Sequence, residues 1–367
     1  MNDSHKNLIY LLACAVNDIS PNITIVKNMD LVSLYQLAKF HATRGAVYIA
    51  ISRAGVHDEN FYQAYKKAVR KNIMLDIERT AIFNCFEQQG VWYMPLKGSV
   101  LKELYPENGM REMADNDILY DSTRQEEVKK IMIEKGYTAK SVGVFHHDTY
   151  LKQPVFNFEL HTVLFSATHA NPFYKYYSDI KRLLHKDDDN KYGYHFSDED
   201  FYVYLTAHEY KHYSGQGTGI RNLLDCYVYI KNKGNTLDWN YIAEQCKKLG
   251  IEDFEQERRN LAMKIFSSDT LPALNNVETE MLNYYMTAGT YGTFENYIKN
   301  KLKTHSKLSF LIRSVFISRK QMEQSVPFTA KSFLLYPIGF IWRCIRLIIF
   351  KRDRLKQTIK VVKKFGK

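Results

Sequence analysis

Apolar residues recur three and four positions apart over residues 1–90, and proline is scarce in this stretch. Two runs carry the pattern: Leu31, Leu34, Leu37 and Ala38, followed by Ile73, Ile77, Ala81 and Phe83. This spacing is typical of helices that bury one face. The pattern therefore predicts an N-terminal helical segment over residues 1–90.

The pattern changes between residues 91 and 168, where short apolar or alternating runs replace the helical spacing. These runs predict strands at 91–96, 117–120, 142–150 and 155–164. One helix is expected among them, at 123–135. Ser122 and Gln125 would form a capping box at its start, and Gly136 would supply the left-handed residue at its end. We expect a small α/β core here.

Strand signals fade from residue 169 to 325, and apolar side chains again recur at helical spacing. This segment is expected to form a larger helical domain. Together the segments predict an α+β protein, in which a small core with a mixed sheet is flanked by N-terminal helices and a C-terminal helical domain. The last segment, 326–367, is interpreted as an amphipathic helix and a basic tail.

The amphipathic helix follows Pro337. Arg343 and Arg346 fall on one face, and the opposite face is apolar, with Ile338, Ile341, Trp342, Ile345, Ile348 and Ile349. Three interpretations stay open: packing on the protein itself, binding to an acidic partner, and peripheral contact of 338–367 with an anionic membrane or a polyanion. Because like charges rarely pack, removal of 351–367 is expected to leave the fold intact.

The distribution of charge and of cysteines along the chain indicates where the basic residues lie and in which compartment the protein is expected. The chain of 367 residues has a formal net charge of +11, but residues 351–367 carry eight Lys or Arg against one Asp, so the rest carries only 11 − 7 = +4. The basic character is therefore mainly a property of the tail. The five cysteines lie far apart without a CxxC pair, and the N-terminus lacks the pattern of a secretory signal. We expect a cytoplasmic protein.

Three segments carry candidate chemistry. Lys97, Gly98 and Ser99 follow the first predicted strand, Asp115 and Asp117 lie one residue apart at the second, and Glu159 lies on a later one. Side chains two residues apart on a strand share a face, so the two aspartates can hold the same divalent cations. Glu159 would complete a carboxylate cluster.

The run LKGSVLKELYPENGMREMADNDILYD, with ELH at 159–161, resembles the uncharacterised bacterial nucleotidyltransferase families of the polymerase-β-like superfamily. The resemblance covers roughly residues 90–165 and continues more weakly around 221–225. It implies that Gly98 and Ser99 lie at the triphosphate, and that Asp115, Asp117 and Glu159 are catalytic and metal-binding. Asn116 departs from the family pattern, which has a large apolar residue there, and it needs a hydrogen-bond partner behind the strand.

We therefore expect a metal-dependent enzyme that moves a nucleoside monophosphate from a triphosphate such as ATP to an acceptor, with release of pyrophosphate. Two Mg²⁺ or Mn²⁺ ions would assist the displacement. The acceptor could be a small molecule, a protein or an RNA. Lys97 and Arg111 are either triphosphate contacts or solvated charges, and His161 shares the strand face of Glu159. The first alternative is a nucleotide-binding module without turnover.

The segment His208-Glu209-Tyr210-Lys211-His212 matches the H-E-x-x-H pattern of zinc hydrolases. A zinc site needs a third ligand, for which only Asp225 and Glu244 lie nearby in sequence, and this hypothesis leaves the three carboxylates unexplained. Two other interpretations remain: His208, His212 and Arg221 line the nucleotide cleft, or the histidines belong to an ordinary helix. The nucleotidyltransferase is the favoured prediction.

Overall fold

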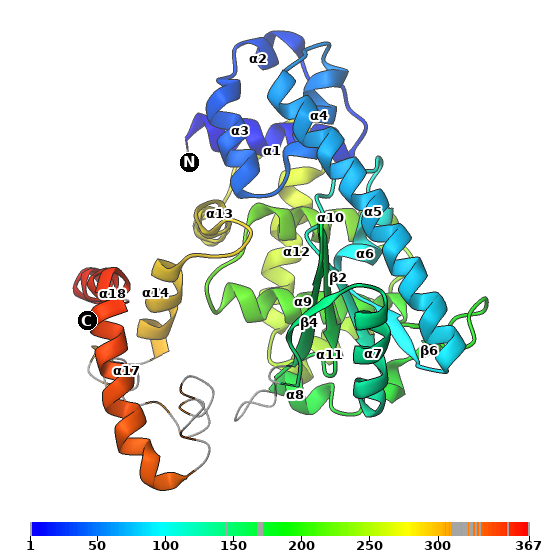
Figure 1. Ribbon diagram of the computed structural model, residues 1–367. Helices are drawn as coiled ribbons and strands as arrows, with labels where there is room; N and C mark the ends of the chain where they lie inside the picture. The colour runs from blue at the N-terminus through cyan, green and yellow to red at the C-terminus, as the bar shows by residue number, and fades with distance from the viewer. Residues whose placement is uncertain are drawn as a thin grey trace. The chain divides into compact units, whose positions relative to one another are not determined.

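The computed structural model describes residues 2–143, 146–166, 172–304, 332–350 and 352–365, together with 306, 307, 309, 317, 322, 326 and 329. The chain forms two compact units, one made of residues 1–210 and 219–290 and the other of residues 211–218 and 291–367. Helices surround one five-stranded mixed sheet in the first unit, which confirms the predicted α+β class (Figure 1).

The N-terminal segment is helical, as predicted. It contains α1 (Asp3–Val16), α2 (Ile23–Lys27), α3 (Leu31–Phe40), α4 (Arg44–Arg53) and α5 (Glu59–Gln89). The last of these has 31 residues, so it is about 46 Å long and reaches from the N-terminal helices to the sheet. Asp58 caps its start by accepting a hydrogen bond from the backbone of Phe61, and Gly90 ends it with φ 71°.

The sheet contains β1 (Tyr93–Pro95), β2 (Asn116–Tyr120), β3 (Thr138–Ser141), β4 (His147–Lys152) and β5 (Phe156–His161). Its order is β1-β2-β5-β4-β3, with β2 and β5 parallel and the other neighbours antiparallel. The strand expected at 142–150 overlaps only β4, which begins at His147, and β3 ends before it, at Ser141. Residues 144 and 145 of this expected strand lie outside the described residues.

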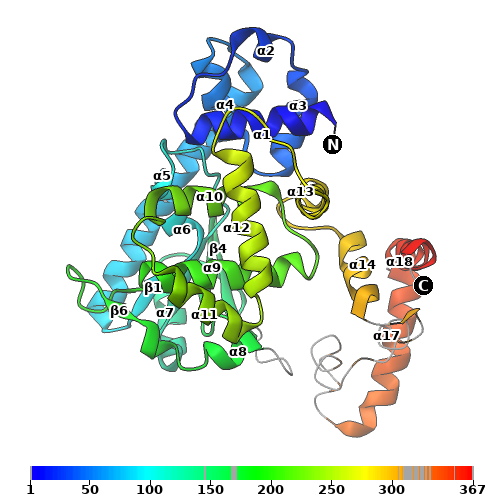
Figure 2. The ribbon, with the colours of Figure 1, turned by 180° about the vertical axis from the view of Figure 1, so that it is seen from behind.

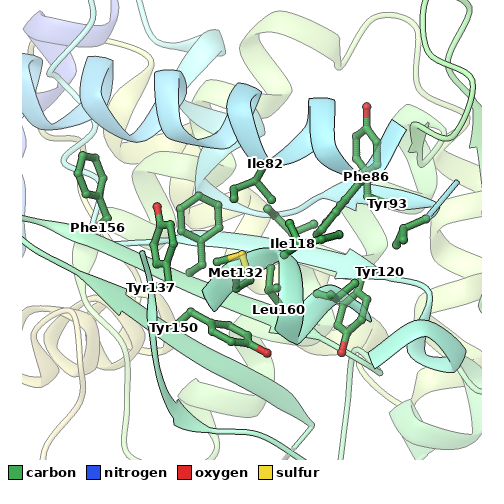
Figure 3. Packing of buried hydrophobic residues seen from close by; sticks show 14 of the residues in the cluster. Ile82, Phe86, Tyr93, Ile118, Tyr120, Met132, Tyr137, Tyr150, Phe156 and Leu160 are labelled. Atoms are coloured by element: carbon green, nitrogen blue, oxygen red, sulfur yellow. The ribbon is translucent and has the colours of Figure 1, made fainter. Parts of the chain in front are cut away.

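One face of the sheet packs against α5 and α7 (Gln125–Glu134). Figure 3 shows Ile82 and Phe86 of α5 close to Ile118 and Leu160 of the sheet, with Met132 of α7 in the same cluster. Along α5, however, Ile73 and Ile77 are exposed. The periodicity therefore predicted the helix, but two of its apolar positions do not contribute to the core.

The start of α7 differs from the expected capping box. Residues Ser122–Arg124 form a short 3₁₀ helix, and Asp121 accepts the capping hydrogen bond from the backbone of Thr123. The Gln125 side chain turns to Asp148 of β4, to which it donates at 2.9 Å. At the other end, Gly136 has φ 82°, as the left-handed position required.

Further helices of the first unit follow the sheet along the chain. They are α8 (Pro172–Tyr176), α9 (Asp198–Tyr213, of which 211–213 belong to the second unit), α10 (Ile220–Lys233), α11 (Trp239–Leu249), α12 (Glu252–Phe266) and α13 (Asn276–Ala288), with a hairpin of β6 (His185–Lys186) and β7 (Tyr194–His195). Figures 1 and 2 show the sheet between α5 on one side and the group α9 to α12 on the other.

The described part of the second unit includes α14 (Phe294–Thr304), α17 (Tyr336–Phe350) and α18 (Arg352–Phe365). Val361 and Val362 of α18 are buried against Ile298 of α14. The expectation that the basic tail does not pack was wrong, because its apolar residues lie on one face of a helix. Among the described residues, no helix combines the length and the apolar character needed to cross a bilayer.

Candidate active site

A tight turn connects β1 to the four-residue helix α6 (Gly98–Leu101). The backbone of Leu96 donates to the carbonyl oxygen of Asp117 at 2.9 Å, which ties the turn to β2. Lys97 follows with φ 48° and ψ −115°, a costly conformation for a residue with a side chain. The Ser99 hydroxyl donates to the carbonyl oxygen of Leu96 at 2.8 Å. These contacts fix the turn beside the end of β2.

Gly98 is required by what packs against it. A Cβ atom at this position would lie 2.6 Å from Nη1 of Arg111 and 2.9 Å from Sδ of Met113. Glycine therefore lets the Arg111 side chain approach the turn closely.

Two of the three predicted carboxylates are brought together by strand register. Asp117 on β2 and Glu159 on β5 are direct partners in the parallel pair. Their side chains lie on the face opposite the core residues Ile118 and Leu160. Asp117, Glu159 and His161 each offer a ligand atom, and these atoms lie within 4.8 Å of one another. Asp115 immediately precedes β2.

Asp117 is the centre of the site's hydrogen bonding. Its Oδ1 atom accepts from Nζ of Lys97 at 2.6 Å and from Nε2 of His161 at 2.8 Å. Burial opposes ionisation, but the charge of Lys97 and the hydrogen bond from His161 hold the pKa of Asp117 far below its usual range. Asp117 is therefore an ionised carboxylate in a mostly buried position.

The pKa of Asp115 is raised by burial and in part by the charges of the other two acids. Burial and then the charges of Asp117 and Glu159 raise the pKa of Asp115 to about 7, against the opposing charges of Lys97 and Arg221. Asp115 therefore lies within the electrostatic influence of both Asp117 and Glu159. Carboxylate oxygens are also the donors that Mg²⁺ and Mn²⁺ prefer, so the residues present fit a divalent cation.

Asn116 has the hydrogen-bond partners that its position requires. Its Nδ2 atom donates to the carbonyl oxygen of Leu75 at 3.0 Å, and its Oδ1 atom accepts from Nη1 of Arg79 at 3.1 Å. Both partners belong to α5. The polar residue between the two aspartates therefore anchors β2 to the long helix, where the family pattern implied an apolar contact.

Arg111 lies next to the turn, and its guanidinium is paired with a carboxylate. Its Nε and Nη2 atoms donate to the two carboxylate oxygens of Asp225 at 2.8 and 2.9 Å, and Tyr105 donates to the same carboxylate at 2.7 Å. Arg111 and Asp225 are both buried. The alternative of a solvated charge is therefore wrong, and in this structure Arg111 supports the turn through its pair with Asp225.

The H-E-x-x-H segment is part of α9. Glu209 is buried and accepts hydrogen bonds from Arg258 at 2.8 Å and Tyr285 at 2.6 Å, so its carboxylate has a structural role. His208 is half-buried, and His212 belongs to the second unit and is exposed. Among the described residues, no group with metal-binding geometry includes either histidine. Arg221 lies close enough for its charge to act on Asp115.

Three further residues reach the site without having been predicted. His147 pairs with His161 across β4 and β5, and His146 precedes it. Alternation along β5 places His161 on the site face, but the cross-strand partner depended on a register that the sequence does not reveal. Tyr204 of α9 has a fully buried hydroxyl without a hydrogen-bond partner, and the charges of Lys97, Asp117 and Glu159 act on it. In the sequence, its only signal was the helical spacing of apolar residues over 169–325.

A family model described as an uncharacterised nucleotidyltransferase matches residues 27–267, which is more than half of the chain and contains the whole carboxylate site. The comparisons with curated proteins and with solved structures gave no match.

Proposed function

The chain belongs to this uncharacterised nucleotidyltransferase family, and we propose that it transfers a nucleoside monophosphate from a nucleoside triphosphate to an acceptor in a metal-dependent reaction. One observation carries the proposal. Asp117 and Glu159 are register partners on parallel strands, and Lys97 from the neighbouring turn reaches the same carboxylate. Acids and a lysine are thus gathered where a triphosphate and its cations could bind.

Asp115, Asp117 and Glu159 would hold the metal, with Mg²⁺ or Mn²⁺ as the ions that suit these oxygen donors and two ions as the expected number. When bound, such ions neutralise the triphosphate and stabilise the charge that develops on the attacking and leaving oxygens. The chain's own contribution is to position these acids on adjacent strands.

Lys97 and the turn after it would contact the phosphates. The first N–H groups of a helical turn have no partner within the helix, so those of Gly98 and Ser99 are suited to an anion. The ammonium of Lys97 adds a positive charge at the same place. We also assign His208 and Arg221 to the nucleotide site. The charge of Arg221 acts on Asp115, which supports this assignment for Arg221.

Glu159 is more exposed to an incoming acceptor than Asp117. Its side chain is 27% exposed, against 9% for Asp117. We assign the removal of the acceptor's proton to Glu159: its carboxylate takes the proton of the acceptor hydroxyl, the acceptor oxygen bonds to the α-phosphorus, and the bond to the β-phosphate oxygen breaks. Pyrophosphate leaves with the electron pair of that bond.

The test is transfer of label from α-³²P-labelled triphosphates with Mg²⁺ and an extract that supplies small-molecule, protein and RNA acceptors. We expect labelled product and released pyrophosphate with the natural chain and neither with Glu159→Gln. Glu244→Gln, at an exposed acid of α11, is the matched control and should keep full activity. Label that transfers only from the γ-position would indicate a kinase, and triphosphate binding without transfer would indicate the binding module.

A second surface supports peripheral contact with an anionic membrane. Residues of α17 at helical spacing are exposed and apolar: Ile338, Ile341, Trp342, Ile345 and Ile349 are 44–62% exposed. The basic helix α18 follows directly. An apolar stripe beside clustered lysines and arginines suits a lipid surface with negative headgroups, and we propose that surface as the partner of α17.

A further inference from the structure

Three histidines gather at the edge of the carboxylate site. His147 opens β4, His161 closes β5, and the two are register partners. His146 precedes β4, and its ring centroid lies 4.6 Å from that of His147 and 5.8 Å from that of His161. One potential ligand atom from each of the three lies within 4.8 Å of the other two.

The hydrogen bonding of His161 favours a metal ligand. The carboxylate of Asp117 is ionised and can only accept, so Nε2 of His161 must carry the proton and donate at 2.8 Å. This fixes the tautomer and leaves the lone pair on Nδ1. That atom is buried and has no hydrogen-bond partner, on a side chain that is 3% exposed. A carboxylate on one ring nitrogen and a free lone pair on the other is the usual arrangement of metal-binding histidines.

The other two rings provide the remaining donors. His147 and His146 approach each other through Nδ1 and Nε2 at 3.3 Å, and Nε2 of His147 lies 3.8 Å from Oε2 of Glu159. Both rings are half-buried, so an ion can reach them. Imidazole nitrogens suit transition metals such as Zn²⁺ and Co²⁺, whereas Mg²⁺ prefers oxygen ligands.

We propose that His146, His147 and His161 bind one divalent transition-metal ion beside the carboxylate site. Three protein ligands leave a coordination position open, as in catalytic zinc sites. The carboxylate of Glu159 lies beside these ligands, with Oε2 at 3.8 Å from Nε2 of His147. The inference rests on the proposed function only in placing the ion beside the transferred nucleotide, because binding of the ion itself requires no nucleotide.

The experiment uses the full chain, freed of metal by a chelator and titrated with Co²⁺ in the absence of nucleotide. We expect one Co²⁺ per chain, with the intense visible absorption of a four- or five-coordinate site with nitrogen ligands. Zn²⁺ should displace it, and Mg²⁺ in large excess should not. Loss of a partner that only orients a ligand weakens metal binding by about 10–100-fold, so His147→Ala and His146→Ala should each weaken it at least as much.

His185→Ala is the control, since it removes an exposed imidazole of the β6–β7 hairpin and should leave Co²⁺ binding unchanged. Far-UV circular dichroism checks that each variant is folded, and His147→Gln provides a second substitution at the same position. Equal Co²⁺ affinity in the natural chain and in folded His147 variants would overturn the inference. Label transfer with Mg²⁺ but no Co²⁺ binding would refute this site alone, whereas Co²⁺ binding without label transfer would refute the proposed function alone.

Discussion

Substitution of Asp225 by Asn should strongly destabilise the first unit. The change keeps the size of the side chain but removes the charge that faces Arg111. It also replaces one carboxylate oxygen, which accepts a hydrogen bond, by an NH₂ group that can only donate. Arg111 would then be a buried cation without its ionic partner, in contact with the turn that carries Gly98.

The magnitude follows from the burial of the pair. Both side chains are 8% exposed, and Arg111 holds the carboxylate through two hydrogen bonds. Removal of one partner of a buried ion pair costs about 3–5 kcal/mol, mostly because the other charge remains buried. A domain of this order loses about 2–4 °C of melting temperature per kcal/mol. We therefore expect a decrease of about 6–20 °C.

Chemical denaturation followed by circular dichroism measures the free energy of unfolding. In Glu244→Gln, which removes an ion pair with Lys248 whose side chains are 52% and 63% exposed, the loss should stay below about 1 kcal/mol. The double variant Arg111→Met/Asp225→Leu replaces the buried pair by apolar side chains and should recover much of the stability. A loss in Asp225→Asn no larger than in Glu244→Gln would refute this reasoning.

Four further outcomes are expected. Asp117→Asn should abolish the rise in melting temperature that Mg²⁺ and triphosphate give. It should also lower the melting temperature of the ligand-free protein, because Lys97 loses its counter-charge. An unchanged effect of the ligands would show that Asp117 does not bind them. Gly98→Ala should cost about 1–3 kcal/mol in a denaturation experiment, because Arg111 must move away from the new methyl group. Burial and then the charges of His5 and Arg221 lower the pKa of His41 to about 4 from 6.5. As the pH falls, the unfolded chain therefore takes up the proton first, and the free energy of unfolding should decrease by about 3 kcal/mol from pH 6.5 to 4. His41→Phe should lose this part of the pH dependence, and an identical profile in the variant would contradict the prediction. The double variant Ile341→Ser/Ile345→Ser should weaken binding to phosphatidylserine vesicles without changing the melting temperature, and neutral vesicles are the control. Unchanged binding to the phosphatidylserine vesicles would exclude α17 as the lipid contact.

The sequence predicted the parts of the site that depend on local patterns. The order of strand, turn and acid is written in consecutive residues, and strand alternation correctly placed Glu159 and His161 on one face. The helical N-terminus followed from apolar periodicity in the same way. These features need only short-range information, so a single sequence is sufficient for them.

Contacts between residues far apart in the sequence could not be predicted from such local patterns. Nothing near Arg111 indicated that its partner is Asp225, 114 positions away, so its charge was assigned to a ligand. The hairpin that forms β3 and β4 contains a register shift between Ala139 and Ser141, which obscures the alternation on which strand prediction depends. Tyr204 reached the site because α9 packs over the sheet, and tertiary packing decides the role of such a residue.

The contact between Lys97 and Asp117 makes the two kinds of ligand mutually dependent. In the ligand-free chain the ammonium already neutralises the oxygen that a cation would use, at 2.6 Å. A cation alone must compete with it, whereas a triphosphate offers the ammonium another anion and frees the carboxylate. Each ligand should then raise the affinity for the other by the same factor. Under the proposed function, the site would thus select the metal–nucleotide complex over either component, and free Mg²⁺ alone would occupy it only weakly.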